Sequence, residues 1–237
     1  MKKTARKIHR WVSYLVFAQL VLWVSGGLTF ALLPFDDIVK GGAVMLPPAP
    51  QELPKGWLSL LESRQFEGVT GISSSQSSQG MLLQLQSAEQ DRWLRMIDGE
   101  AALPPSEESI RRYAEQMYIG EGEVVSVRFI DESEYRYFGL VDELYGKVDV
   151  WQASFSDLLG SRLYFEGDTG RYLAVRNHFW VFYDAMWRLH IMDYSAGKDF
   201  NNKLLIFFVV LSFVFALSGL VLTLSSIKRA LVKVRRD

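Results

Sequence analysis

The feature that most constrains this chain of 237 residues is an apolar run from Leu204 to Leu224 that contains no charged residue. A helix needs about 20 predominantly apolar residues to cross the hydrocarbon core of a bilayer. A second apolar run, Trp11 to Leu33, is interrupted only by uncharged polar residues. A cleaved signal peptide is the alternative for this first run, but the apolar core of such peptides is only about 7–15 residues long. The sequence therefore predicts two transmembrane helices, the first of them an uncleaved anchor.

Charge is segregated along the chain. Five basic residues and no acidic residue precede Asp36, whereas six basic residues and a single acidic one, Asp237, follow Phe200. The segment between them carries 15 basic and 26 acidic residues, a net charge of −11. Because basic residues flank the cytoplasmic ends of membrane spans, we expect both termini in the cytoplasm. The acidic middle would then lie outside, in the periplasm if the source is a Gram-negative bacterium.

Several chemistries are disfavoured by what the sequence lacks. It has no cysteine, which removes disulfides, thiolate metal sites and iron–sulfur clusters. It contains no motif for phosphate-loop or dinucleotide binding, serine hydrolysis or zinc proteolysis. An acidic domain repels phosphate, so nucleic acid is not an expected partner. The serine-rich stretch Ser73 to Ser78 is expected to be an exposed loop rather than a nucleophile site.

The acidic middle reads as a repeated pattern after a stiff proline linker at residues 46–50. A helix over Trp57–Phe66 is expected first, followed by strands over Val69–Ile72, Met81–Gln86 and Arg92–Ile97 and a turn at residues 98–99. A second helix beginning at Ser106 is followed by strands over Val124–Ile130, Lys147–Phe155 and Arg162–Phe165 and a turn at residues 168–170. Two α-β-β-β units of about 70 residues indicate an internal duplication and an α+β domain.

An aromatic segment joins this domain to the second apolar run. Five of its side chains are spaced to share one stripe of a helix: Trp180, Tyr183, Trp187, His190 and Tyr194. The chain therefore divides into a basic N-terminus with the first span (1–35), the acidic domain (36–175), an aromatic interfacial helix (176–200), and the second span with a basic tail (201–237).

Particular residues resemble the PepSY-associated transmembrane family. They are Ile8-His9-Arg10-Trp11 before a span containing Ser25-Gly26-Gly27-Leu28, the strand and turn over residues 162–171, Leu189-His190, and Leu217-Ser218-Gly219-Leu220 in the second span. The resemblance covers most of the chain and identifies it as a small two-span member with PepSY-like repeats. It implies an inner-membrane protein that binds haem b and passes electrons to periplasmic acceptors such as ferric siderophores, for iron uptake. It also implies that His9 and His190 are the haem ligands.

The two histidines are expected on opposite sides of the membrane, separated by about 30 Å of hydrocarbon, so they cannot ligate one iron. A homodimer would pair each histidine with its own copy and hold one or two haems, and pairing with another redox membrane protein would serve equally. Nearby arginines are candidates for binding haem propionates: Arg6 and Arg10 beside His9, and Arg176 and Arg188 beside His190. His178 lies twelve residues from His190 and is expected to be a structural or partner-facing residue.

Each of these features also has a plainer explanation. A histidine at a basic membrane end is usually interfacial, aromatic residues beside a span usually form the interfacial belt, and small residues in a span usually serve packing. The prediction is a haem-dependent transmembrane reductase or electron-transfer subunit, in contact with lipid and with a periplasmic acceptor. The alternative is a membrane-anchored PepSY binding or regulatory module, protease-inhibitory in function, with no redox chemistry.

Overall fold

The computed structural model describes residues 2–39, 41, 44–46, 55–57, 68–195 and 197–234. The chain divides into two compact units. The helical unit comprises Met1–Leu32 and Tyr183–Asp237, and the sheet unit comprises Leu33–Phe182. Residues 47–50 of the proline linker and nearly all of the helix predicted over Trp57–Phe66 lie outside the described residues.

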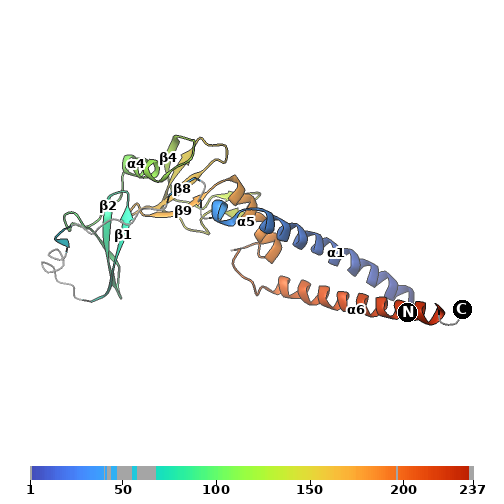
Figure 1. The fold of residues 1–237 in the computed structure, drawn as a ribbon. Helices are drawn as coiled ribbons and strands as arrows, with labels where there is room; N and C mark the ends of the chain where they lie inside the picture. Colours follow the sequence, from blue (N-terminus) through green and yellow to red (C-terminus); the bar gives the residue numbers. More distant parts are fainter. Residues whose placement is uncertain are drawn as a thin grey trace. The chain divides into compact units, whose positions relative to one another are not determined.

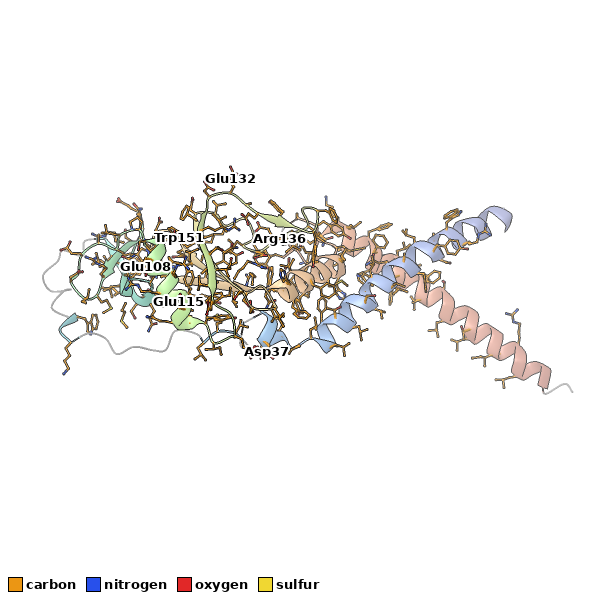
Figure 2. All side chains as sticks on the ribbon, turned by 90° about the horizontal axis from the view of Figure 1, so that it is seen from above. Asp37, Glu108, Glu115, Glu132, Arg136 and Trp151 are labelled. Atoms are coloured by element: carbon orange, nitrogen blue, oxygen red, sulfur yellow. The ribbon has the colours of Figure 1, made fainter. Side chains whose placement is uncertain are left out.

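Two long helices form most of the helical unit. They are α1 (Lys2–Leu32) and α6 (Lys203–Val234), which contact each other, run in opposite directions in Figure 1 and cross each other in Figure 2. By length and composition, each has a stretch apolar enough to cross a membrane, Arg10–Leu32 in α1 and Lys203–Leu220 in α6. None of the Lys203–Leu220 stretch is buried inside the protein, which leaves a long apolar helix without a protein cover among the described residues. The predicted pair of apolar helices is therefore confirmed.

A shorter helix, α5 (His178–Ile191), begins in the sheet unit and ends in the helical unit. It ends three residues before Tyr194, so the expected aromatic stripe is helical only as far as His190. A connecting segment of residues 192–202 then leads to α6. A helix is therefore present where the interfacial helix was predicted, with the last nine predicted residues outside it, and its place at the membrane interface remains a prediction.

The first sheet of the sheet unit is antiparallel, in the order β1 (Val69–Ser77), β2 (Gly80–Ser87) and β3 (Arg92–Arg95). Its buried side chains are Leu83, Leu85, Leu94 and Met96, against which Trp57 packs. The expectation of a loop at Ser73–Ser78 was wrong, because Ser73–Ser77 lie in β1. Serine tolerates a sheet edge, and here β1 gains its regular register from the apolar strand β2.

The second sheet carries the larger core. It has the order β4 (Val124–Ile130), β7 (Val150–Phe155), β8 (Arg162–Glu166) and β9 (Tyr172–Arg176), all antiparallel. The helix α4 (Glu107–Met117) lies on one face (Figure 1). Its buried stripe Ile110, Tyr113, Ala114 and Met117 packs on alternate strand residues that include Val127, Ala153, Leu163 and Phe165. As predicted, Ser106 begins this helix: its hydroxyl accepts the Ser109 N–H at 3.2 Å.

The opposite face of this sheet is covered by residues 131–149, the segment between β4 and β7. This segment contains a small hairpin of β5 (Tyr135–Arg136) and β6 (Val141–Asp142) and inserts Glu143, which is only 4 % exposed. The Glu143 carboxylate accepts hydrogen bonds from Arg162 at 2.8 and 2.9 Å and from the Tyr164 hydroxyl at 2.5 Å. The buried acid is therefore paired on the strand that it covers, as a buried charge must be.

Candidate functional site

His190 lies near the end of α5, where α5 packs against the C-terminal part of α1. The ring of Phe30 on α1 contacts three rings of the α5 stripe, Tyr183 at 4.9 Å, Trp187 at 5.6 Å and His190 at 5.4 Å between centroids. These contacts confirm that Tyr183, Trp187 and His190 share one face of the helix. The stripe thus serves to dock α5 on α1 and to fix the plane of the imidazole.

A glycine makes this close approach feasible. Gly26 is buried on α1, and a Cβ built on it would lie 2.9 Å from His190 Nδ1. The next residue, Gly27, has nothing within 4 Å of its Cβ position among the described residues. His190 Nδ1 is buried and has no hydrogen-bond partner among them. Because Nδ1 is enclosed against α1, Nε2 is the ring nitrogen left for a ligand.

A pocket of about 450 Å³ lies beside His190. Its other walls are aromatic and aliphatic: Trp23 of α1, Trp187 and Ile191 of α5, Phe200, and Leu205 and Val209 of α6. Ligand pockets are typically about 300–1,000 Å³, mostly apolar, with few polar groups. This pocket has that character, with an imidazole as its main polar group. It suits a flat apolar ligand that takes a nitrogen donor.

Hydrogen bonds hold the end of α5 in place. The indole N–H of Trp23 donates to the carbonyl of His190 at 2.9 Å, and the Asn202 amide donates to the carbonyl of Ile191 at 2.8 Å. Carbonyls in the last turn of a helix have no partner within the helix, so both contacts satisfy groups that would otherwise be unpaired. Asn202 also accepts the Leu205 N–H at 2.8 Å and thereby caps α6. One asparagine thus joins the end of α5 to the start of α6.

Arg188, predicted to bind a propionate, lies on another face of α5 and is 1 % exposed. Its guanidinium donates to Asp184 at 2.6 Å and to the carbonyl of Ser195 at 2.8 Å. Gly197, at φ +69°, passes directly over this guanidinium. The structure therefore gives Arg188 a structural partner in Asp184, and its role toward a propionate remains a prediction.

The connecting segment is organised by Asp193, which is 5 % exposed. Burial by itself would raise the pKa of its carboxyl. Hydrogen bonds from the Ser195 hydroxyl and from the N–H groups of Asp199, Ser195 and Lys198 outweigh burial and hold this pKa well below its ordinary value. Asp193 thus acts as a charged anchor for the turn that leads from α5 to α6.

The other predicted ligand, His9, lies in α1, but its side chain and that of Arg6 are outside the described residues. Arg10 is exposed on the same helix. Seventeen helical residues separate His9 from Gly26, which packs on His190, and this corresponds to about 25 Å along α1. The two histidines therefore belong to separate places, as their positions in the sequence predicted.

His178 and Arg176 lie in the sheet unit. His178 is the exposed first residue of α5, and its imidazole lies against Gly160. Arg176 stacks on the ring of Trp180, with 4.0 Å between its guanidinium carbon and the ring centroid, and donates to the carbonyl of Glu143 at 2.9 Å. Burial lowers the pKa of Arg176 from its ordinary value. These contacts assign Arg176 a structural role on the second sheet.

Sequence reasoning did not identify Trp23, Gly26 and Phe30 as neighbours of His190. The contacts join residues more than 150 positions apart, and no local pattern encodes them.

No protein-family model matches the chain, and comparison with curated proteins and with solved structures gave no match. Membership of the PepSY-associated family therefore remains a prediction.

Proposed function

We propose that this chain is an inner-membrane protein that binds haem b and transfers electrons across the membrane to a periplasmic acceptor such as a ferric siderophore. The observation that carries the proposal is His190, held with Nδ1 enclosed and with an apolar pocket of about 450 Å³ beside it. When bound, haem b would supply one-electron chemistry, accepting an electron from a quinol or cytoplasmic donor and passing it outward.

The residues around His190 fit the demands of such a group. Gly26 and Phe30 fix the imidazole from the α1 side, so that Nε2 can ligate iron without searching rotamers. The lining is mostly aromatic and aliphatic, which favours binding of an apolar macrocycle. Trp23, by holding the carbonyl of His190, keeps the last turn of α5 in place when a ligand enters.

The opposite directions of α1 and α6 in Figure 1 support the proposed topology. If both helices cross the bilayer, the beginning of α1 and the end of α6 emerge on the same side. Both of these ends are basic, so that side is the cytoplasm and the sheet unit is periplasmic. Two antiparallel sheets, the second preceded by α4, support the view of the sheet unit as a pair of PepSY-like repeats.

Bis-histidine ligation at this place needs a second chain. His9 is about 25 Å away along α1, and His178 is twelve residues, about 18 Å, away along α5. We therefore propose a homodimer, or a complex with another redox membrane protein, in which a second histidine completes the site. Gly219 of α6 is exposed, and a Cβ there meets nothing within 4 Å among the described residues. It is thus open to a helix of a second chain.

The experiment compares two adjacent glycines in the full-length chain purified in nanodiscs. Both Gly26→Ala and Gly27→Ala gain about 1 kcal/mol of helix propensity, so they form a matched pair. Only Gly26→Ala pushes on the imidazole of His190, and displacing such a ligand should weaken haem binding about 10–100-fold. The readout is the reduced-minus-oxidised spectrum and haem per chain, with His190→Ala as the full loss.

Three outcomes have distinct meanings. Wild-type protein without b-type absorbance favours the anchored binding or regulatory module. Haem that survives His190→Ala places the site elsewhere. Haem that is lost in Gly219→Leu together with the oligomer supports ligation between chains, because a Cβ at this exposed position meets no described residue of the same chain. A monomeric Gly219→Leu variant that keeps its haem overturns the dimer.

A further inference from the structure

The tip of the β5–β6 hairpin exposes three aromatic rings. Tyr135 is 60 % exposed, Tyr137 49 % and Phe138 fully exposed, and every residue from 131 to 139 is exposed. We call these three side chains the aromatic tip. Figure 2 shows Glu132, on the same segment, projecting from the surface of the sheet unit. Three large rings on four consecutive residues form a patch of the kind that marks interaction sites rather than the scattered apolar residues of an ordinary surface.

The backbone of this tip is strained. Tyr137 and Phe138 have φ values of 48° and 56°, in the left-handed region that bulky residues rarely adopt. The turn is closed by a hydrogen bond from the Leu140 N–H to the Tyr137 carbonyl at 3.1 Å, but the ring of Phe138 makes no ring contact with any other described residue and is fully exposed. Turn positions with positive φ usually carry glycine or asparagine, so two exposed aromatic side chains there make this turn a candidate functional position.

The base of the hairpin, in contrast, is held firmly. Val141 is fully buried, and the carboxylate of Asp142 accepts the N–H groups of Leu144 at 2.9 Å and Gly146 at 2.5 Å. Glu143 binds Arg162 on β8 beneath it. The rings are thus carried on a backbone whose base is already held, which reduces the backbone ordering that binding requires.

The charge around the tip limits what can bind there. The nearby basic groups are already in ion pairs: Arg128 with Glu134, Arg136 with Glu143 and Lys147 with Glu166. Three exposed acids, Asp131, Glu132 and Asp149, have no ion pair among the described residues. Their negative charge would repel anionic lipid headgroups and would repel the same surface on a second copy.

We propose that the aromatic tip is a docking surface for another protein, one that offers an apolar recess bordered by lysine or arginine. The rings would fill the recess, and the three acids would meet the basic border. Rigid aromatic anchors surrounded by complementary charge are the usual composition of binding hot spots. This surface is independent of the site at His190 and of whether that site binds haem.

The first test places a photo-crosslinking phenylalanine analogue at position 138 of the full-length chain in cells of its source organism. Leu158 is the matched control, since it is also a fully exposed apolar residue of the sheet unit. We expect one discrete protein adduct from position 138, identified by mass spectrometry, none from position 158, and loss of the adduct in a Glu132→Lys background. Adducts with lipid or with a second copy, no adduct, or equal adducts from both positions would overturn the proposal.

The second test uses the protein identified in this way, purified, against the full-length chain in nanodiscs. Phe138→Gly should raise the Kd between the full-length chain and this partner about tenfold or more, the loss typical of a hot-spot residue. The same change should leave the thermal midpoint unchanged or raise it, because glycine adopts positive φ without strain. Leu158→Gly should leave the binding unchanged. Unaltered binding by Phe138→Gly, or a loss that merely follows unfolding, would refute a docking role.

Discussion

The buried polar groups beneath residues 131–149 and those among α1, α5 and α6 are satisfied in opposite ways. Beneath residues 131–149, Glu143 has donors from Arg162, Tyr164 and Arg136, and Tyr164 in turn accepts from Gln152. In the helical unit, three buried atoms lack a partner among the described residues: Gln19 Nε2, His190 Nδ1 and Ser212 Oγ. A complete network stabilises a fold, whereas an incomplete one marks where a ligand, lipid or second chain supplies the missing partner.

The largest expected loss of stability comes from a variant in the hydrogen-bond network around Glu143. Glu143→Ala would leave Arg162 buried without its counter-ion and remove the acceptor of the Tyr164 hydroxyl. Breaking one side of a buried ion pair costs about 3–5 kcal/mol. Denaturant unfolding of the sheet unit, followed by tryptophan fluorescence, would measure the loss. A loss below about 1 kcal/mol would mean that water replaces the carboxylate, and the contrast between the two regions would fail.

Asp193 tests whether the helical unit also depends on a charged anchor. Asp193→Asn keeps the size but presents an amide to the N–H groups of Lys198 and Asp199, so we expect a loss of about 1.5–3 kcal/mol. The folded-state pKa of Asp193 lies below its unfolded value. Its contribution is therefore fully present above about pH 4 and is lost as the pH falls further.

The measurement is unfolding in detergent micelles as a function of pH, with wild type and Asp193→Asn compared. The difference between their free energies of unfolding should be constant near neutral pH. It should narrow only in acid, below the unfolded-state pKa of about 3.9. A difference that narrows already at pH 6 would contradict the assigned hydrogen bonds.

A smaller effect is expected from a single hydroxyl of the complete network. Tyr164→Phe removes the group that donates to Glu143 and accepts from Gln152 at 2.6 Å. Arg162 still pairs with Glu143, so the loss should be about 1–2 kcal/mol rather than that of a broken ion pair. The double variant with Glu143→Ala should lose less than the sum of the single losses, because the residues share one network. Additive losses would show that the hydroxyl acts alone.

The sequence predicted those elements that local pattern determines. The strands over residues 81–86, 124–130 and 162–165 and the helix that begins after Ser106 are confirmed, because alternation and capping are local properties. β9 was missed, although the turn residues Asp168-Thr169-Gly170 followed by the apolar run 172–175 are a hairpin signal. The hairpin of β5 and β6 was also missed, since its two-residue strands give too short an alternation to detect.

The site was predictable in part and for the same reason. Helical spacing placed Tyr183, Trp187 and His190 on one face, and their shared contact with Phe30 confirms it. Arg188 lies on another face of α5 than His190, and Asp184 lies one helical turn before it. These two facts explain why its guanidinium binds Asp184. The packing of Gly26 on His190 depends on tertiary contact between α1 and α5, which a single sequence does not contain.

The smallest expected change in stability concerns the three buried polar atoms of the helical unit that lack a partner among the described residues. Trp23 and Val209 line the same pocket, and α1 and α6 run in opposite directions in Figure 1, so Gln19 and Ser212 each lie about one turn beyond that pocket on the same side of it. Removing an unpaired buried polar atom relieves its desolvation cost. Gln19→Leu should therefore change the stability in micelles by less than about 0.5 kcal/mol, or raise it by about 1 kcal/mol.

The control is Thr223→Val, which removes an exposed hydroxyl that already bonds to the carbonyl of Gly219 in its own helix. Thr223→Val should leave the free energy of unfolding close to that of the wild type, whether or not the protein associates. If Gln19→Leu instead lowers stability by more than about 1 kcal/mol, Gln19 has a partner in the membrane that a single chain does not provide. Dependence of that loss on protein concentration would then separate a second chain from Ser212 of the same chain, since only association between chains obeys mass action.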